Sequence, residues 1–232
     1  IRITQFQVHT GEEVVKALNK MHKESGDQLK GVVLDLRNNP GGVLQAAAEV
    51  VDAFITEGMI VYTKGRLDNT ELSFEATPNN PSRGVPLIVL INEGSASASE
   101  IVSGALQDHQ RGIIMGTQSF GKGSVQTILP LGGDHGLKLT TALYYTPSGR
   151  SIQAQGVTPD IEVKPARLTP IEARLQIKEA DLEGHLESGQ QPPASAKPKS
   201  NTTLAESDYQ LFEALGLLKG MHLLQSKLNP KN

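Results

Sequence analysis

Three short apolar segments most constrain what this chain can fold into. Gly31–Arg37 (GVVLDLR), Pro86–Gly94 (PLIVLINEG) and Gly112–Gly116 (GIIMG) have the length and the β-branched content of buried strands. Helical patterns follow the first two, at Val43–Ile55 and Ser95–Asp108. Because strands that alternate with helices pair in parallel through crossover connections, the sequence predicts an α/β fold around a mostly parallel sheet.

Other segments flank this pattern. Ile1–Gln7 alternates apolar and polar residues, which predicts a half-buried strand. Thr10 and Glu13 have the spacing of a capping box, which predicts that a helix begins there. Ser124–Leu129 and Leu137–Tyr145 predict two longer strands joined by a glycine-rich loop.

The last third of the chain differs in kind. Thr169–Leu182 has a helical pattern with proline in its first turn, and Ser188–Thr203 is rich in proline, serine and lysine, as flexible linkers are. Tyr209–Leu228 predicts an amphipathic helix, which either docks on its own core or forms a subunit contact. We therefore divide the chain into a core at residues 1–165, a helical segment at 166–187, a flexible linker at 188–205 and a C-terminal amphipathic helix, a candidate oligomerisation element, at 206–232.

Composition excludes several classes of protein. The chain has no cysteine, which removes thiol catalysis, disulfides and thiolate metal sites. A net charge of −3 argues against a general nucleic-acid or anionic-membrane binder. No apolar run approaches the roughly 20 residues of a membrane-spanning helix, and no histidine pair has the spacing of metal ligands on a helix. We expect no metal and no cofactor. Since the chain begins at Ile1 rather than methionine, we interpret it as a fragment or a processed form.

Ser97 is a candidate nucleophile. It lies in the segment GSASAS, where an apolar strand passes into a helix. Such a turn exposes the side chain at the end of the strand and places it near helix N–H groups, which favour developing negative charge. The alternative is that these serines and alanines only begin a helix, and on local evidence this alternative is the stronger one.

Lys122 and the segment Asn38–Gly42 (NNPGG) are two further candidates. Lys122 lies between glycines in FGKG, on an accessible loop, although an ordinary solvated lysine would fit the same pattern. The N–H groups of a glycine-rich turn after a core strand can stabilise an oxyanion, although a plain turn is equally consistent. The segment GKGS lacks the first glycine and the following helix of a phosphate-binding loop.

None of the six histidines is a candidate base. None lies in a glycine-rich motif at the end of a predicted strand. His109 lies at the opposite end of the helix that begins near Ser97, about 18 Å away along the helix axis.

Four motifs occur in an order that resembles the C-terminal processing peptidases, also called tail-specific proteases. They are DLRNNPGG, INEGSASASEIVSGALQD, QSFGKGSVQ and GVTPDIEV, and the resemblance covers residues 1–165. It implies a ClpP/crotonase-like core and a serine endopeptidase that cleaves protein substrates near their C-termini. It also implies export, in bacteria to the periplasm or the cell envelope. The PDZ domain that the family carries before the region of Ile1 has no counterpart in this sequence.

The resemblance assigns roles residue by residue. It implies that the middle serine, Ser97, is the nucleophile, that Lys122 is the general base, and that Gln126 supports this Ser-Lys dyad. It implies that the N–H groups of Gly42 and Ala98 form the oxyanion hole. Because a lysine accepts a proton only in its neutral form, we expect an apolar cleft around Lys122. Hydrolysis would then pass through an acyl-enzyme.

Two rival functions remain open at this point. A crotonase-like acyl-CoA enzyme would use the same oxyanion hole, and Lys122 would then bind a phosphate. A non-catalytic scaffold or adaptor would leave the cleft unused. For the peptidase, the expected partners are protein or peptide substrates, a second copy of the chain in a homo-oligomer, and a regulatory or adaptor protein, with no nucleic acid.

Overall fold

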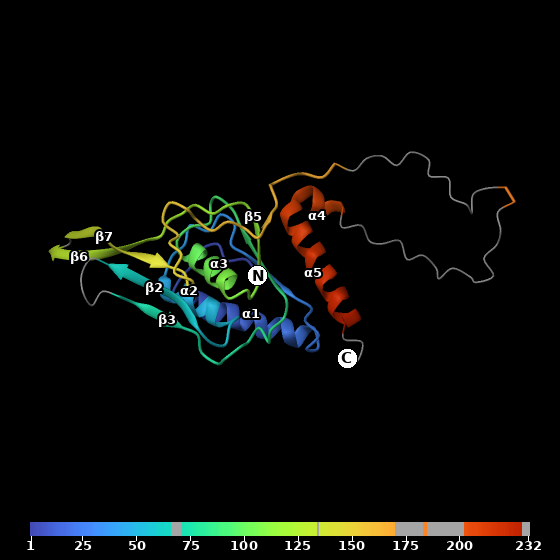
Figure 1. Ribbon diagram of the computed structural model, residues 1–232, viewed down its shortest axis with the longest axis horizontal. Coiled ribbons are helices and arrows are strands. Elements are labelled where there is room, and N and C mark those ends of the chain that lie inside the picture. The colour runs from blue at the N-terminus through green and yellow to red at the C-terminus, as the bar shows by residue number, and fades with distance from the viewer. Residues whose placement is uncertain (66–70, 134, 170–182, 185–201, 229–232) are drawn as a thin grey trace.

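A computed structural model describes residues 1–65, 71–133, 135–169, 183–184 and 202–228 (Figure 1). The helix expected at Thr169–Leu182 and the linker expected at Ser188–Thr203 therefore lie almost entirely outside the described residues. The last part of the expected linker is helical, because helix α4 begins at Thr202.

A parallel sheet forms the centre of the protein. Its strands are β1 (Val32–Asp35), β4 (Leu87–Ile91), β5 (Ile113–Gly116) and β8 (Ile161–Glu162), in the order β1-β4-β5-β8. Each neighbouring pair is parallel. The mixed α/β fold with a parallel core, expected from the alternation of apolar strands and helices, is confirmed.

Helices cover both faces of this sheet. Helices α1 (Thr10–Glu24), α2 (Leu44–Asp52) and α3 (Ala98–Asp108) share the main hydrophobic core with one face. Helix α5 (Tyr209–Leu228) packs on the other face. All five residues of β4 are buried, because alternate side chains enter the two clusters.

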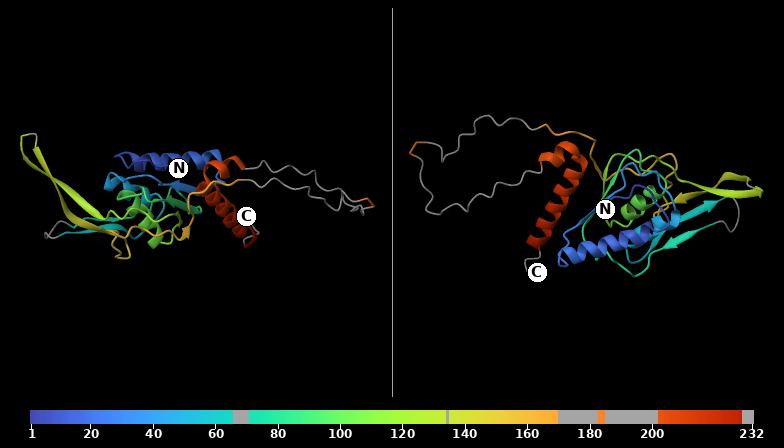
Figure 2. Two further views of the ribbon diagram at one scale, coloured as in Figure 1. Left: turned by 90° about the horizontal axis from the view of Figure 1, so that it is seen from above. Right: turned by 180° about the vertical axis from the view of Figure 1, so that it is seen from behind.

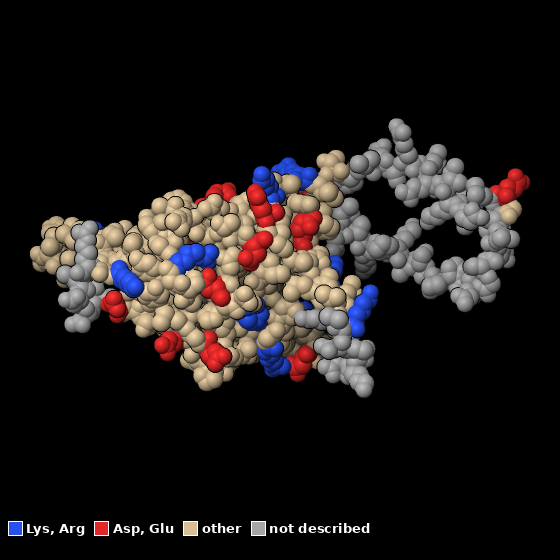
Figure 3. Space-filling view, viewed as in Figure 1, with Lys and Arg blue, Asp and Glu red and all other residues tan. Residues whose placement is uncertain are grey.

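A second, antiparallel sheet lies beside the first. Its strands are β2 (Met59–Gly65), β3 (Ser73–Glu75), β6 (Ser124–Gly132) and β7 (His135–Tyr145), in the order β3-β2-β7-β6. Strands β6 and β7 extend from the body as a two-stranded ribbon, at the end opposite α5 (Figures 1 and 2). The outer end of the ribbon carries few charges (Figure 3). Its exposed aliphatic side chains are Ile128, Leu129, Leu131, Leu137 and Leu139.

The N-terminal region differs from its prediction in two ways. Ile1–Gln7 is not a strand, because only Arg2 and Phe6 form isolated bridges with the chain around β1. Thr10 does not cap α1, because the N-cap residue is His9. The Thr10 hydroxyl instead accepts a hydrogen bond of 2.8 Å from the N–H of Gln7. The helix predicted from the spacing of Thr10 and Glu13 is present, but the predicted cap at Thr10 is wrong.

Helix α5 docks on the chain's own sheet. Ala214 and Leu218 are buried against β4 and β5. Just before α5, the Asp208 carboxylate accepts two hydrogen bonds of 2.7 Å from the Arg37 guanidinium. The first of the two roles considered for this helix is therefore present in the structure. Within the described parts of the chain, no helix is long and apolar enough to cross a membrane.

Candidate active site

The candidate site lies at the carboxyl edge of the parallel sheet. Strand β1 leads into the NNPGG turn and β4 leads into the GSASAS turn, and because these strands are parallel neighbours, both turns emerge at one edge. The side-chain amides of Asn38 and Asn92 join the turns. The Asn38 N–H donates to Asn92 Oδ1 over 2.8 Å, and Asn92 Nδ2 donates to Asn38 Oδ1 over 2.9 Å.

Ser97 occupies a strained backbone position at the N-terminus of α3. Its φ is 55° and its ψ is −111°, a conformation that costs a serine energy. Strained residues of this kind cluster at functional sites, and a nucleophile on a sharp strand-to-helix turn is one such case.

The neighbouring serines have structural roles instead. Ser95 is fully buried, and its hydroxyl donates to the carbonyl of Leu36 over 2.8 Å. Ser99 is also fully buried, and its hydroxyl donates to the carbonyl of Asn39 over 2.9 Å. Ser97 is the partly exposed serine of the three, as a nucleophile must be to reach a substrate.

Glycines allow the first turn to approach Ser97 closely. Gly41 has a φ of 105°, and a Cβ added there would lie 2.8 Å from the Ser97 Cβ and 3.0 Å from the Ala98 nitrogen. The Gly41 N–H donates to Asn39 Oδ1 over 2.9 Å. By contrast, no hydrogen bond among the described residues uses the N–H of Gly42 or of Ala98. Two backbone donors therefore remain available beside Ser97.

Lys122 lies on the loop between β5 and β6 and is partly buried. Its backbone N–H donates a hydrogen bond to the carboxylate of Glu100, which also accepts a hydrogen bond from the backbone N–H of Ser97. The Gln126 side chain is exposed on β6. Among the described residues, no hydrogen bond joins the Lys122 amine to Ser97 or to Gln126. The structure thus links the two loops through hydrogen bonds from their backbones to the Glu100 carboxylate.

Glu100 is the residue of this site that the sequence analysis missed. It is fully buried, and it accepts hydrogen bonds from both the serine turn (residues 94–99) and the lysine loop (residues 117–123). A signal was present, because Glu100 follows Ser97 at the spacing of a capping box. The same spacing occurs at Thr10 and Glu13, where no side-chain cap forms.

His109 lies away from these loops, at the C-terminal end of α3. Its Nε2 is 2.7 Å from the carbonyl oxygen of Met59, on β2. The position agrees with its exclusion as the base for Ser97.

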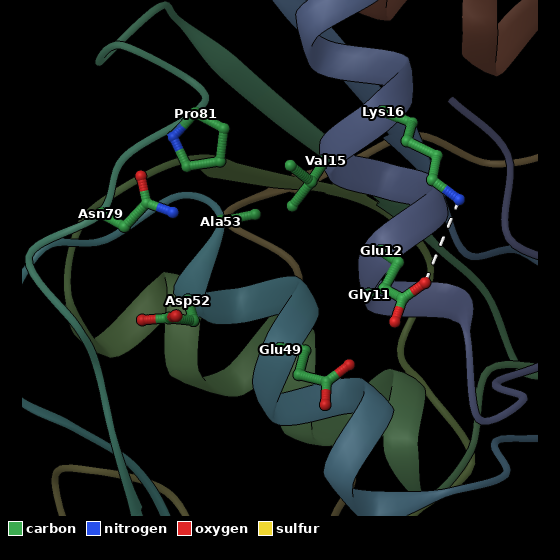
Figure 4. Close-up of a pocket in the computed structure, with 9 residues that line it drawn as sticks. All are labelled: Gly11, Glu12, Val15, Lys16, Glu49, Asp52, Ala53, Asn79 and Pro81. Atoms are coloured by element: carbon green, nitrogen blue, oxygen red, sulfur yellow. Dashed lines mark ion pairs between the residues drawn. The ribbon is translucent and has the colours of Figure 1, made fainter.

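A separate cavity of about 390 Å³ lies between α1, α2 and the chain near Pro81 (Figure 4). Its carboxylates come from Glu12, Glu49 and Asp52 (Figure 4). None of the expected site residues lines this cavity. The candidate site is therefore the pair of turns at the sheet edge.

The chain belongs to peptidase family S41, which matches residues 1–163. It is 49% identical over 228 residues to the carboxy-terminal-processing protease of Bartonella bacilliformis. This match covers 95% of this chain and 51% of that protein. It is 42% identical over 160 residues to the carboxyl-terminal-processing protease of Synechocystis sp., covering 69% of this chain and 36% of that protein. The resemblance seen in the motifs is confirmed. The chain spans about half the length of the first of these relatives.

A solved structure has a similar fold. The photosystem II D1 C-terminal processing protease matches with a TM-score of 0.64 and 35% sequence identity. The match covers 70% of this chain and 41% of that protein.

Proposed function

We propose that this chain carries the catalytic core of a serine endopeptidase that cleaves protein substrates near their C-termini. The observation that carries the proposal is the strained backbone of Ser97, next to the unused N–H groups of Gly42 and Ala98. Membership of peptidase family S41 and the names of the relatives support the reaction class. A ClpP/crotonase-like arrangement of the core is part of the same proposal.

The proposed reaction has two stages. The neutral Lys122 amine takes the proton of the Ser97 hydroxyl as Oγ attacks the scissile carbonyl carbon. The N–H groups of Gly42 and Ala98 hold the resulting oxyanion, Lys122 gives its proton to the leaving amine, and the C–N bond breaks. Water then attacks the acyl-enzyme with Lys122 again as the base, which releases the carboxylic acid and restores the Ser97 hydroxyl. Gln126 orients the lysine amine by an uncharged hydrogen bond.

Covalent labelling tests the nucleophile. In the Ser97→Ala variant we expect hydrolysis of β-casein to fall by at least about 10³-fold, because the acyl-enzyme cannot form. Reaction with a fluorophosphonate reagent should disappear as well. Ser73→Ala, at an exposed position of β3, is the matched control and should keep both activities. Hydrolysis or labelling that persists in Ser97→Ala would refute the assignment.

Self-association and location are further parts of the proposal. Leu224 on α5 is exposed although other residues of this helix dock on the sheet, which supports a contact with a second copy or a regulatory protein. Light scattering of Leu224→Glu against the parent chain tests the contact, and an unchanged mass would count against it. The family resemblance supports a periplasmic or cell-envelope location, which cell fractionation tests.

A further inference from the structure

We propose that Glu100 is a positioning residue that fixes the serine turn relative to the lysine loop. This inference rests on the proposed function, since it assumes that Ser97 and Lys122 act together. Its basis is the carboxylate of Glu100, which is hydrogen-bonded to the backbone of both residues.

The contacts divide evenly between the two carboxylate oxygens. Oε2 accepts from the N–H of Ser97 and from the N–H of Lys122, each over 2.8 Å. Oε1 accepts from the Ser119 hydroxyl and from the N–H of Gly121, each over 2.6 Å. The backbone N–H groups of the proposed nucleophile and the proposed base therefore share one acceptor oxygen. This shared oxygen holds the two residues at a fixed separation.

The four groups around the Glu100 carboxylate all donate hydrogen bonds to it. Backbone N–H groups only donate, so three of the four protons around the carboxylate are fixed. The fourth belongs to Ser119, whose hydroxyl donates to Glu100 Oε1 and whose oxygen also accepts from the N–H of Val157 over 2.7 Å. Since the side chain is fully buried, four donors also offset the cost of removing the charge from water.

These contacts exceed what a helix cap requires. Capping α3 needs one acceptor for the N–H of Ser97, and an exposed glutamate would provide it. The other three bonds of Glu100 reach across to the segment from Ser119 to Lys122. The Glu100 carboxylate thus joins the serine turn to the lysine loop, in addition to capping α3.

The lysine loop has other attachments, so loss of Glu100 should misplace it rather than unfold it. The Phe120 N–H donates to the Ser95 carbonyl over 3.0 Å, and the Ala154 N–H donates to the Gly121 carbonyl over 2.9 Å. A displacement of about 1 Å between reacting groups can cost about 10²-fold in rate. The expected defect is therefore in catalysis more than in substrate binding.

Glu100→Gln is the most informative variant because it keeps the shape and removes the charge. The single amide oxygen can serve either the pair of N–H groups on Ser97 and Lys122 or the donors on the opposite side. In either orientation the amide NH₂ faces at least one backbone N–H that has lost its acceptor. Glu75→Gln, at an exposed site on β3, is the matched control.

The experiment compares β-casein hydrolysis with the rate of fluorophosphonate acylation. For Glu100→Gln we expect kcat to fall about 10- to 100-fold while KM changes less than about twofold. The rate constant of acylation should fall by the same factor, while the fraction of protein finally labelled stays at the parent value. Glu75→Gln should match the parent chain. A parent-like kcat, or a loss accounted for by a smaller labelled fraction at an unchanged rate, would overturn the proposal.

Ser119→Ala keeps the test valid if Glu100→Gln fails to fold. It removes one of the four donors and leaves the bonds to Ser97 and Lys122 in place. We expect a smaller loss of kcat at an unchanged KM, and a parent-like kcat would count against the proposal. Ser97→Ala, measured alongside, distinguishes a failure of the proposed function from a failure of the role of Glu100. Hydrolysis by Ser97→Ala would reject the proposed function, whereas an inactive Ser97→Ala beside a fully active Glu100→Gln would reject the role of Glu100 alone.

Discussion

The carboxyl edge of the parallel sheet and the β6–β7 ribbon are built in opposite ways. At the sheet edge, β4 is buried on both faces, and the buried side chains are paired: Asn39 hydrogen-bonds to the carbonyl of Ile3, and Glu100 accepts from the lysine loop. On the ribbon, Ile128 and Leu131 are 68% and 66% exposed, and none of the helices within the described residues lies over β6 and β7 (Figure 2). Fixed geometry therefore arises where polar groups are buried and paired, whereas the ribbon presents aliphatic side chains without a core.

The ribbon is nevertheless anchored at its base. Strand β7 pairs with β2, and the rings of Tyr62 and Tyr145 stack with centroids 5.3 Å apart. Beyond this base only two strands remain, and two strands alone are marginally stable in water. Substitutions should therefore have very different effects in the two regions.

The largest expected effect is on catalysis at the sheet edge. Because arginine stays protonated at any working pH, Lys122→Arg should lower β-casein hydrolysis by about 10²- to 10⁴-fold, the usual contribution of a general base. Lys138→Arg, on the ribbon, makes the same exchange away from the site and should leave the rate unchanged. A Lys122→Arg rate within tenfold of the parent would show that this lysine is not the base.

Next in size is the stability of the parallel sheet. Leu34 is fully buried in the main core, so Leu34→Ala should lower the free energy of unfolding by about 2–5 kcal/mol. Urea denaturation followed by circular dichroism measures this change. A loss below about 1 kcal/mol would mean that the sheet is packed less tightly than its burial indicates.

A smaller effect concerns the attachment of α5. Hydrogen bonds from Arg37 lower the pKa of Asp208 below its ordinary value of 3.8, although partial burial acts in the opposite direction. Since the pKa is lower in the folded state, the ion pair stabilises the folded protein above pH 3.8, and this contribution is lost as the pH falls through the folded-state pKa. Hydrogen bonds to Asp35 and to Asp208 raise the pKa of Arg37, which stays charged throughout.

Urea midpoints at several pH values test this attachment. Asp208→Asn should lower the midpoint at pH 6, and its difference from the parent chain should shrink towards pH 3. Asp27→Asn is the control, because its ion pair with Arg83 is exposed and should contribute little. A difference that stays constant with pH would contradict the role of the Asp208 charge.

The smallest effect is expected on the ribbon. Ile128→Ser replaces an exposed side chain and should change the free energy of unfolding by no more than about 0.5 kcal/mol. A loss above about 1 kcal/mol would mean that the ribbon is covered in solution, and it would remove the contrast with the sheet edge.

Three of the four parallel strands, β1, β4 and β5, were predictable because each is a continuous apolar run between turn signals, whereas the two-residue strand β8 was not predicted. Strands β2 and β3 were missed, because β2 mixes buried and exposed residues without strict alternation and β3 is a three-residue strand at the edge of the antiparallel sheet. Ile1–Gln7 alternates like a strand but meets β1 only at isolated bridges. Whether a segment pairs as a strand depends on the strand that lies next to it in the fold. The segment's own sequence does not specify that neighbour.

The order of motifs and three strands of the parallel sheet can be read from the sequence, because they depend on local patterns, and the family resemblance supplies the residues proposed for the dyad. The strain at Ser97, the docking of α5 on its own sheet and the link that Glu100 makes between two loops arise only on folding. A buried carboxylate is stable only where donors from distant parts of the chain converge on it, and that convergence exists only in the folded protein.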